Sequence, residues 1–211
     1  MKTALTPLGF DTSQLISFIT KDGISKGDHV MILRPKESPN EQRGDTAFNE
    51  TKEILNKISE DIKIKKIVLN TKNFEETVLE ISNLIDQIEG EIVVNLSGGV
   101  RSIIVALTIN SIFYHEKIDR VYNLEKIDRN MREIELPFIS FELTDNEKKI
   151  FTTISKEGPL TYNELVDKLD LSKSTVSRLS KILEKKHIVT IEEKGKQKQV
   201  SLSLTGKLIS T

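Results

Sequence analysis

The stretch from Thr161 to Lys181, TYNELVDKLDLSKSTVSRLSK, predicts a helix-turn-helix. Thr161 and Glu164 form a T-x-x-E capping box, in which a hydroxyl and a carboxylate satisfy the unpaired amides of a helix start. Asp170-Leu171-Ser172 follows as a tight turn, and Ser172 can cap the next helix. One stripe of this next helix is apolar, comprising Val176, Leu179, Ile182 and Leu183. Its other face is polar and therefore open to a partner.

The segments on either side of this stretch complete a winged helix-turn-helix. A second capping box, Thr144 to Glu147, begins an earlier helix that ends at Gly158-Pro159. After His187, apolar residues alternate on both sides of a basic tip, residues 194–198, and end at Leu204, which is typical of a β-hairpin. We therefore expect residues 141–211 to form a winged helix-turn-helix DNA-binding domain.

The charge of this domain favours double-stranded DNA as its partner. Residues 144–211 carry 13 Lys and Arg against 9 Asp and Glu, a net +4, whereas the upstream part is −5. The third helix would offer hydrogen bonds to base edges, and the hairpin lysines would add salt-sensitive contacts with phosphates. The expected DNA-binding residues are Lys173, Ser174, Thr175, Ser177, Arg178, Lys181, Lys194, Lys196 and Lys198. The alternative is a solvated lysine-rich hairpin on a winged helix that binds protein.

Residues 1–140 alternate short β-rich runs with amphipathic helical runs, which predicts a doubly wound α/β domain with a mostly parallel, Rossmann-like sheet. The six expected strands are 2–6, 29–34, 65–70, 91–96, 120–124 and 132–136, the last two as a hairpin. The apolar runs 67–69 and 93–94 are expected to be buried on both faces of the sheet. We expect a mobile loop over residues 35–44 and a domain boundary near residue 140, after Pro137.

Two loops of this domain predict a ligand site. Residues 6–12, TPLGFDT, and residues 95–102, NLSGGVRS, each follow an expected strand and open a helix. Ligands of doubly wound sheets bind beyond the carboxyl ends of the strands where the strand order reverses, so adjacent first and fourth strands would bring both loops together. Glycine amides, a helix start and Arg101 favour an anionic ligand. Neither loop is a G-x-G-x-x-G or Walker motif, and Gly98-Gly99 could alternatively be a mere tight turn.

The combination of the two loops with a C-terminal winged helix resembles the archaeal CRISPR-associated transcriptional regulators that carry a CARF domain. The resemblance covers essentially the whole chain. It implies a homodimer whose CARF domains bind a cyclic oligoadenylate, commonly the tetra-adenylate, and whose winged helices bind promoters of CRISPR genes. By this resemblance the ligand-binding residues are Pro7, Leu8, Gly9, Phe10, Asp11, Ser97, Gly98, Gly99, Val100 and Arg101. A single helix-turn-helix per chain independently favours a dimer, because two recognition helices one duplex turn apart gain specificity.

Three functions remain open at this point. The leading hypothesis is a ligand-responsive transcription factor, and the runner-up is an enzyme that cuts its own cyclic ligand, although neither loop contains a histidine or lysine as proton carrier. The third is a DNA-binding scaffold whose α/β half only dimerises. The chain has no cysteine and three scattered histidines, so we expect no metal. We also expect no cofactor and no catalytic residue. No apolar run could cross a membrane, which leads us to expect a cytoplasmic protein.

Overall fold

The computed structural model describes residues 1–36, 41–125, 127–128, 130–137, 142–195 and 197–210. The chain divides into two compact units, Met1–Ile139 and Ser140–Thr211, and each is described by itself. The domain boundary expected near residue 140 lies outside the described residues. Within the described part of the chain, no helix is long and apolar enough to cross a bilayer.

The first unit is built on a six-stranded sheet of order β3-β2-β1-β4-β5-β6. Its strands are β1 (Lys2–Pro7), β2 (His29–Pro35), β3 (Lys63–Leu69), β4 (Glu91–Asn95), β5 (Ile118–Leu124) and β6 (Met131–Glu133). All neighbouring strands are parallel except β5 and β6, which pair antiparallel as the expected hairpin. The predicted doubly wound, mostly parallel sheet is therefore confirmed. The strand order reverses between β1 and β4, which are neighbours.

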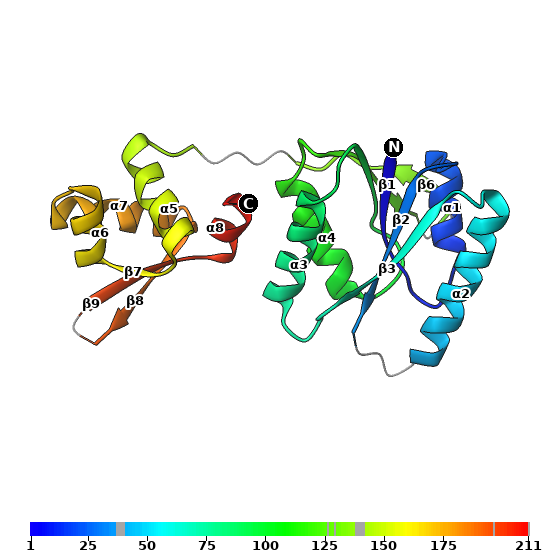
Figure 1. Ribbon diagram of the computed structural model, residues 1–211, viewed down its shortest axis with the longest axis horizontal. Helices are drawn as coiled ribbons and strands as arrows, with labels where there is room; N and C mark the ends of the chain where they lie inside the picture. The colour runs from blue at the N-terminus through cyan, green and yellow to red at the C-terminus, as the bar shows by residue number, and fades with distance from the viewer. Residues whose placement is uncertain (37–40, 126, 129, 138–141, 196, 211) are drawn as a thin grey trace. The chain divides into compact units, whose positions relative to one another are not determined.

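Helices cover both faces of this sheet (Figure 1). They are α1 (Ser13–Asp22), α2 (Glu41–Ile58), α3 (Phe74–Asp86) and α4 (Arg101–Phe113). Figure 1 shows α1 and α2 on one face and α3 and α4 on the other. Under α1 and α2 lies a core that includes the fully buried Phe18, Val30 and Leu55. Each strand of the β1 and β4 pair leads directly into the loop before a helix, so both loops lie at the carboxyl edge of the sheet.

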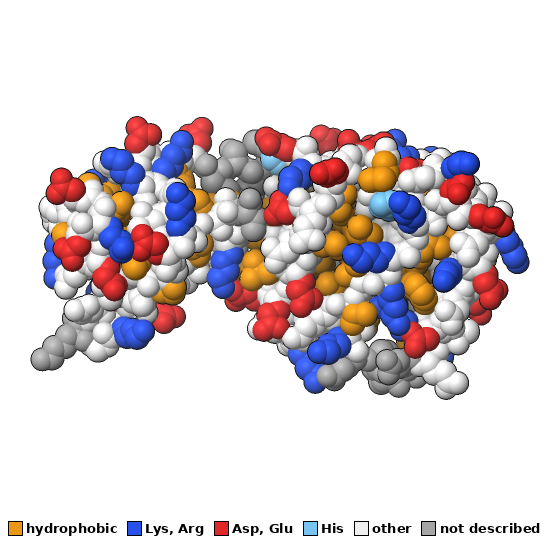
Figure 2. All heavy atoms as spheres, in the orientation of Figure 1, with side chains coloured by type: hydrophobic (Ala, Val, Ile, Leu, Met, Phe, Trp, Pro, Cys, Tyr) orange, Lys and Arg blue, Asp and Glu red, His pale blue; other side chains and the backbone are white. Residues whose placement is uncertain are grey.

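Two expectations for the first unit were wrong. The run Ile67 to Leu69 is not buried on both faces, because β3 is an edge strand and Val68 is 51% exposed. Figure 2 shows apolar and basic side chains reaching the surface over this strand. The loop expected over residues 35–44 does not extend to Gly44, because α2 begins at Glu41; residues 37–40 are outside the described part.

The second unit is a winged helix-turn-helix, as predicted. Its elements are α5 (Asp145–Glu157), β7 (Leu160–Thr161), α6 (Tyr162–Leu169), α7 (Lys173–Lys185), β8 (Val189–Lys194), β9 (Gln197–Leu202) and α8 (Leu204–Ile209). Both predicted capping boxes are formed, Thr144 with Glu147 and Thr161 with Glu164, and the Ser172 hydroxyl accepts the Thr175 amide at 3.1 Å. The apolar stripe of α7 is buried against α5, α6 and the hairpin through Val176, Leu179 and Leu183.

Two short elements of this unit were not expected. Strand β7 adds a third strand to the wing sheet, in the order β7-β9-β8, by pairing Leu160 with Val200. Leu204, expected as the end of the hairpin, instead begins α8, where the Ser203 hydroxyl accepts the Gly206 amide at 3.1 Å.

Candidate ligand pocket and DNA interface

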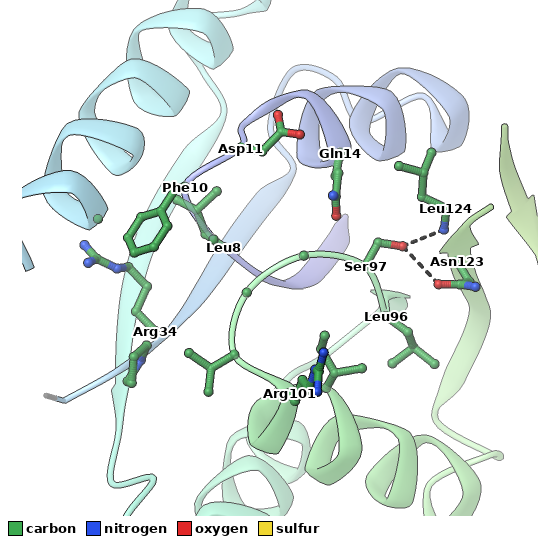
Figure 3. A pocket seen from close by; sticks show the side chains of 17 residues that line it. Leu8, Phe10, Asp11, Gln14, Arg34, Leu96, Ser97, Arg101, Asn123 and Leu124 are labelled. Atoms are coloured by element: carbon green, nitrogen blue, oxygen red, sulfur yellow. Dashed lines mark hydrogen bonds between the residues drawn. The ribbon is translucent and has the colours of Figure 1, made fainter. Parts of the chain in front are cut away.

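A pocket of about 510 Å³ lies at the carboxyl ends of β1 and β4 (Figure 3). Nine of the ten residues expected to bind a ligand line it: Leu8, Gly9, Phe10, Asp11, Ser97, Gly98, Gly99, Val100 and Arg101. Pro7, the tenth, is buried as the last residue of β1 and supports the loop from behind. The volume falls within the range of roughly 300–1,000 Å³ that is usual for small-molecule sites.

The two loops touch each other at glycines. A β-carbon on Gly9 would lie 3.0 Å from the Gly99 amide nitrogen, and one on Gly99 would lie 2.8 Å from the Pro7 β-carbon. Gly98 and Gly99 both have positive φ values, 82° and 72°, which side-chain-bearing residues rarely adopt. The glycines are therefore required for this close approach of the two backbones.

Buried and partly buried hydrogen bonds fix the loop that follows β4. The Ser97 hydroxyl donates to Asn123 Oδ1 at 3.2 Å and accepts the Leu124 amide at 2.5 Å (Figure 3). The Asn95 side chain accepts the Ser97 amide at 3.0 Å and donates to the Thr6 hydroxyl at 3.0 Å. Ser97 is 6% exposed. Its hydroxyl is thus already used to join β4 to β5, and its part in the pocket is structural.

The two helices that begin at the pocket differ in their N-terminal caps from the other helices whose N-cap residue is described. Side chains of Asn73, Thr144, Thr161, Ser172 and Ser203 accept amides at the starts of α3, α5, α6, α7 and α8. The N-cap residues of α1 and α4, Thr12 and Val100, make no such bond. At α1, Asp11 Oδ1 accepts the Ser13 amide at 2.9 Å. Open amides at two helix starts give the pocket a positive potential that suits an anion.

Two arginines line the pocket from different elements. Arg101, on the first turn of α4, is exposed. Arg34, near the end of β2, is 5% exposed and its Nη1 donates to Asp45 Oδ1 at 2.6 Å. Lys66 donates to the same oxygen at 2.8 Å, and these two hydrogen bonds, Lys66 first, lower the pKa of Asp45. Gly44 leaves the room that the Arg34 guanidinium occupies, because a β-carbon there would lie 1.8 Å from Nη2.

An aromatic ring stands at the rim of the pocket. Phe10 is 47% exposed, and the Arg43 guanidinium lies 4.7 Å from its ring centroid. An exposed aromatic ring beside a cation is suited to stacking on a planar base.

In the second unit, the expected DNA-binding side chains of α7 lie away from its core. Lys173, Ser174, Arg178 and Lys181 are exposed, while Thr175 and Ser177 are half-buried. Lys194 and Lys198 are exposed on β8 and β9, and Lys196 lies outside the described residues. A hollow of about 380 Å³ joins the start of α7 to the hairpin and is lined by Tyr162, Asn163, Lys173, Ser174, Ser177, Gln197 and Lys198.

A family comparison identifies the first unit. Residues 2–137 match the model of the Csa3 CRISPR-associated Rossmann-like domain, which is more than half of the chain. The chain belongs to the Csa3 family. Residues 143–190 of this Csa3-family chain match a winged helix-turn-helix DNA-binding model, so a CRISPR-associated CARF-type domain and a DNA-binding domain stand in one chain.

Comparison with solved structures finds similar chains at low sequence identity. Enterococcus italicus Csm6 bound to cyclic hexa-2'-fluoro-hexa-dAMP aligns with a TM-score of 0.50 and 14% identity over 88% of this chain and 49% of that chain. Overoxidized AbfR bound to DNA aligns with a TM-score of 0.31 and 28% identity over 32% of this chain and 51% of that one. The chain thus spans about half the length of these two proteins. No curated protein matches the Csa3-family chain.

Several lining residues of the Csa3-family pocket were missed by the sequence reasoning, notably Gln14, Arg34, Asn123 and Leu124. Asn123 and Leu124 end β5 and Arg34 lies near the end of β2, so they reach the same edge from the strands on either side of the central pair. Ligands bind beyond the carboxyl ends of strands, and applying this rule to β2 and β5 as well as to β1 and β4 would have identified these three residues. Gln14, in the first turn of α1, carried no such signal.

Proposed function

We propose that this chain is a ligand-responsive transcriptional regulator of CRISPR-associated genes. Its winged helix binds promoter DNA, and its α/β domain binds a cyclic oligoadenylate, the tetra-adenylate, as a homodimer. The observation that carries the proposal is the pocket at the strand-order reversal, where two helix starts without N-cap hydrogen bonds meet a glycine loop and Arg101. Membership of the Csa3 family supports the CRISPR context.

The chemistry of the pocket is consistent with a nucleotide ring. Open amides and Arg101 suit phosphates, whereas Leu8, Phe10 and Leu124 supply apolar surface for bases and sugars. In a two-fold dimer, two such pockets would share a ring of four phosphates, each pocket taking half. Ligand binding would then bias the placement of the two winged helices relative to each other.

For the DNA interface, we propose that α7 enters the major groove. Ser174, Thr175 and Arg178 would contact base edges, with Lys173, Ser177 and Lys181 beside them. The hollow between α7 and the hairpin would receive a backbone phosphate between Lys173 and Lys198, and Lys194 and Lys196 would extend this phosphate contact along the hairpin.

Cleavage of the ring is not favoured by the residues of the pocket. Its described lining contains no histidine or lysine, and the Ser97 hydroxyl, a candidate donor to the phosphate, already binds Asn123 and Leu124. We therefore expect labelled cyclic tetra-adenylate to be recovered intact after incubation with the protein.

Calorimetry of the full chain with cyclic tri-, tetra- and hexa-adenylate tests the sensor, and titration of CRISPR promoter fragments with and without ligand tests the regulator. We expect the tetra-adenylate to bind with a dissociation constant well below 100 µM and to change promoter affinity. Dissociation constants weaker than roughly 100 µM for all rings would reject the sensor assignment. Equal affinity for promoter and random DNA would reject the regulator.

A further inference from the structure

Gln14 is the one side chain of the first turn of α1 that lines the pocket. It is half-buried, and Figure 3 shows it pointing from α1 toward the glycine loop. Its Oε1 would lie 3.0 Å from a β-carbon built on Gly98, so the absence of a side chain there makes room for the amide. Among the described residues its carboxamide has no hydrogen-bond partner.

Several other polar side chains that line the pocket are already engaged. Ser97 is bonded to Asn123 and Leu124, Arg34 is paired with Asp45, and Asp11 accepts the Ser13 amide. Arg101 can only donate hydrogen bonds. Gln14 therefore presents to the pocket a hydrogen-bond donor, Nε2, and an acceptor, Oε1, that no described residue uses. Gln14 is half-buried, so leaving its carboxamide without a partner is costly.

We propose that Gln14 is a specificity-determining residue that reads the adenine base of the bound ring. A carboxamide presents one donor and one acceptor side by side, and an adenine edge presents the complementary pair, the N6 amino group and a ring nitrogen. Gln14 Oε1 accepts from N6, and Nε2 donates to the ring nitrogen. This inference rests on the proposed function, and it assigns base selection to α1 rather than to the phosphate-binding loop.

The test compares two rings of the same size and charge on the same protein. One is cyclic tetra-adenylate, and the other carries purine bases that lack the 6-amino group. We expect the full-length wild type to bind the adenine ring more tightly by about 5- to 150-fold, the discrimination usual for a bidentate base contact. In Gln14→Leu, of similar size but without polar atoms, this ratio should fall close to one.

Gln14→Glu separates base reading from a structural role. A carboxylate still accepts from N6, so this variant should keep a preference for adenine while binding both rings more weakly, through repulsion of the phosphates. The ratio is internally controlled, because each variant is measured with both rings and a general loss of folding would weaken both. Gln87→Ala, at the end of α3, should leave both affinities unchanged.

The failure of this inference is distinguishable from failure of the sensor assignment. If the wild type binds neither ring, the proposed function fails. If the wild type binds both rings equally, or if Gln14→Leu keeps the full preference for adenine, the sensor stands and Gln14 does not read the base.

Discussion

At the scale of single residues, Gly99 holds the pocket together because both its conformation and its lack of a side chain are required. Its φ of 72° is left-handed, and the Pro7 β-carbon would lie 2.8 Å from any β-carbon placed there. Gly23 has a nearly identical φ of 73°, but nothing lies within 4 Å of its missing β-carbon. A substitution at Gly23 therefore tests backbone strain alone, whereas the same substitution at Gly99 tests backbone strain together with the contact between the two loops.

We predict that Gly99→Ala lowers the free energy of unfolding by about 1–3 kcal/mol more than Gly23→Ala does, because the added methyl group must displace the loop after β1. Gly23→Ala should lose only the roughly 1–2 kcal/mol of a left-handed alanine. Chemical denaturation measures both. Ligand affinity should fall in Gly99→Ala alone, and equal losses of stability in the two variants would contradict the loop contact.

Arg101 should contribute a charge-assisted hydrogen bond to a ligand phosphate. We predict that Arg101→Ala weakens cyclic tetra-adenylate binding by about 1.5–3 kcal/mol, roughly 10- to 150-fold, without changing bare DNA affinity. Arg132→Ala is the control and should have no effect on ligand binding. Arg132 lies on β6 and pairs with Asp128. Calorimetry measures both variants. If Arg101→Ala binds the ring as tightly as the wild type, Arg101 does not contact a ligand phosphate.

The sequence predicted the glycine loops but not the whole lining of the pocket, and the reason is physical. A left-handed glycine pair before a helix is a local feature, so Gly98 and Gly99 were recognisable. Arg34 is a pocket residue only because Gly44, in the segment expected to be a loop, leaves space for it and Asp45 on α2 binds its guanidinium. A contact between two separate elements, such as that of Arg34 on β2 with Asp45 on α2, produces no recognisable pattern in the local sequence.

At the scale of elements, cap chemistry located the starts of two helices of the winged helix-turn-helix. The boxes at Thr144 and Thr161 satisfy amides locally, and both helices begin where expected. Helix α8 was missed because Gly206 disfavours a helix, yet a β-carbon there would lie 2.1 Å from the Ile188 carbonyl oxygen. Tertiary packing demands that glycine, and the pairing of Leu160 with Val200 that makes β7 is likewise non-local.

Glu147 makes the stability of the winged helix depend on pH. Burial acts to raise its pKa, but the Thr144 amide at 2.8 Å and Lys186 at 3.0 Å outweigh burial, and the pKa lies below the ordinary 4.5. A carboxylate with a lowered pKa in the folded state stabilises the fold above pH 4.5, and this contribution is lost as the pH falls below it.

We predict that Glu147→Gln lowers the free energy of unfolding at pH 7 by about 1–3 kcal/mol and flattens the loss of stability between pH 5 and pH 3. Thermal melts over a pH series measure both effects. Glu164→Gln, in the equivalent but exposed capping box, should cause a smaller change at pH 7. An acid-induced loss as steep in Glu147→Gln as in the wild type would assign the pH dependence to other groups.

Recognition helix α7 and the hairpin should contribute differently to DNA binding. We predict that Arg178→Ala weakens binding to the cognate promoter by about 1–3 kcal/mol and leaves random DNA nearly unaffected, because we propose that its guanidinium contacts a base edge. Lys198→Ala should weaken all sequences alike and reduce the slope of log affinity against log salt by about one. Titrations over a salt series distinguish the two variants. If Arg178→Ala loses equal affinity for promoter and random DNA, Arg178 contacts a phosphate rather than a base.

At the scale of the whole molecule, the proposed regulator needs two chains. Helix α4 is apolar on nearly all sides, and although Ile103, Ala106 and Leu107 face the core, Val105 is 50% exposed. An apolar helix with an exposed valine, starting at the pocket, is a candidate surface for a two-fold partner.

We predict that the full chain sediments at twice its 23.9 kDa mass and that Val105→Lys shifts it toward monomer, because a lysine cannot be buried unpaired in the interface. Val68→Lys is a matched control, since Val68 on edge strand β3 is 51% exposed. Analytical ultracentrifugation at tens of micromolar decides the question. A wild type that is monomeric there would count against the dimer.

The missing N-cap bonds of α1 and α4 have a practical consequence for anyone handling the protein. A side-chain N-cap bond is worth about 1 kcal/mol, and neither Thr12 nor Val100 supplies one. Sulfate or inorganic phosphate from a purification buffer would bind at these helix starts, raise the melting temperature by mass action and compete with a nucleotide ring. Affinities measured in phosphate buffer would then be too low, and a chloride-based buffer of matched ionic strength is the appropriate medium for comparing nucleotide rings.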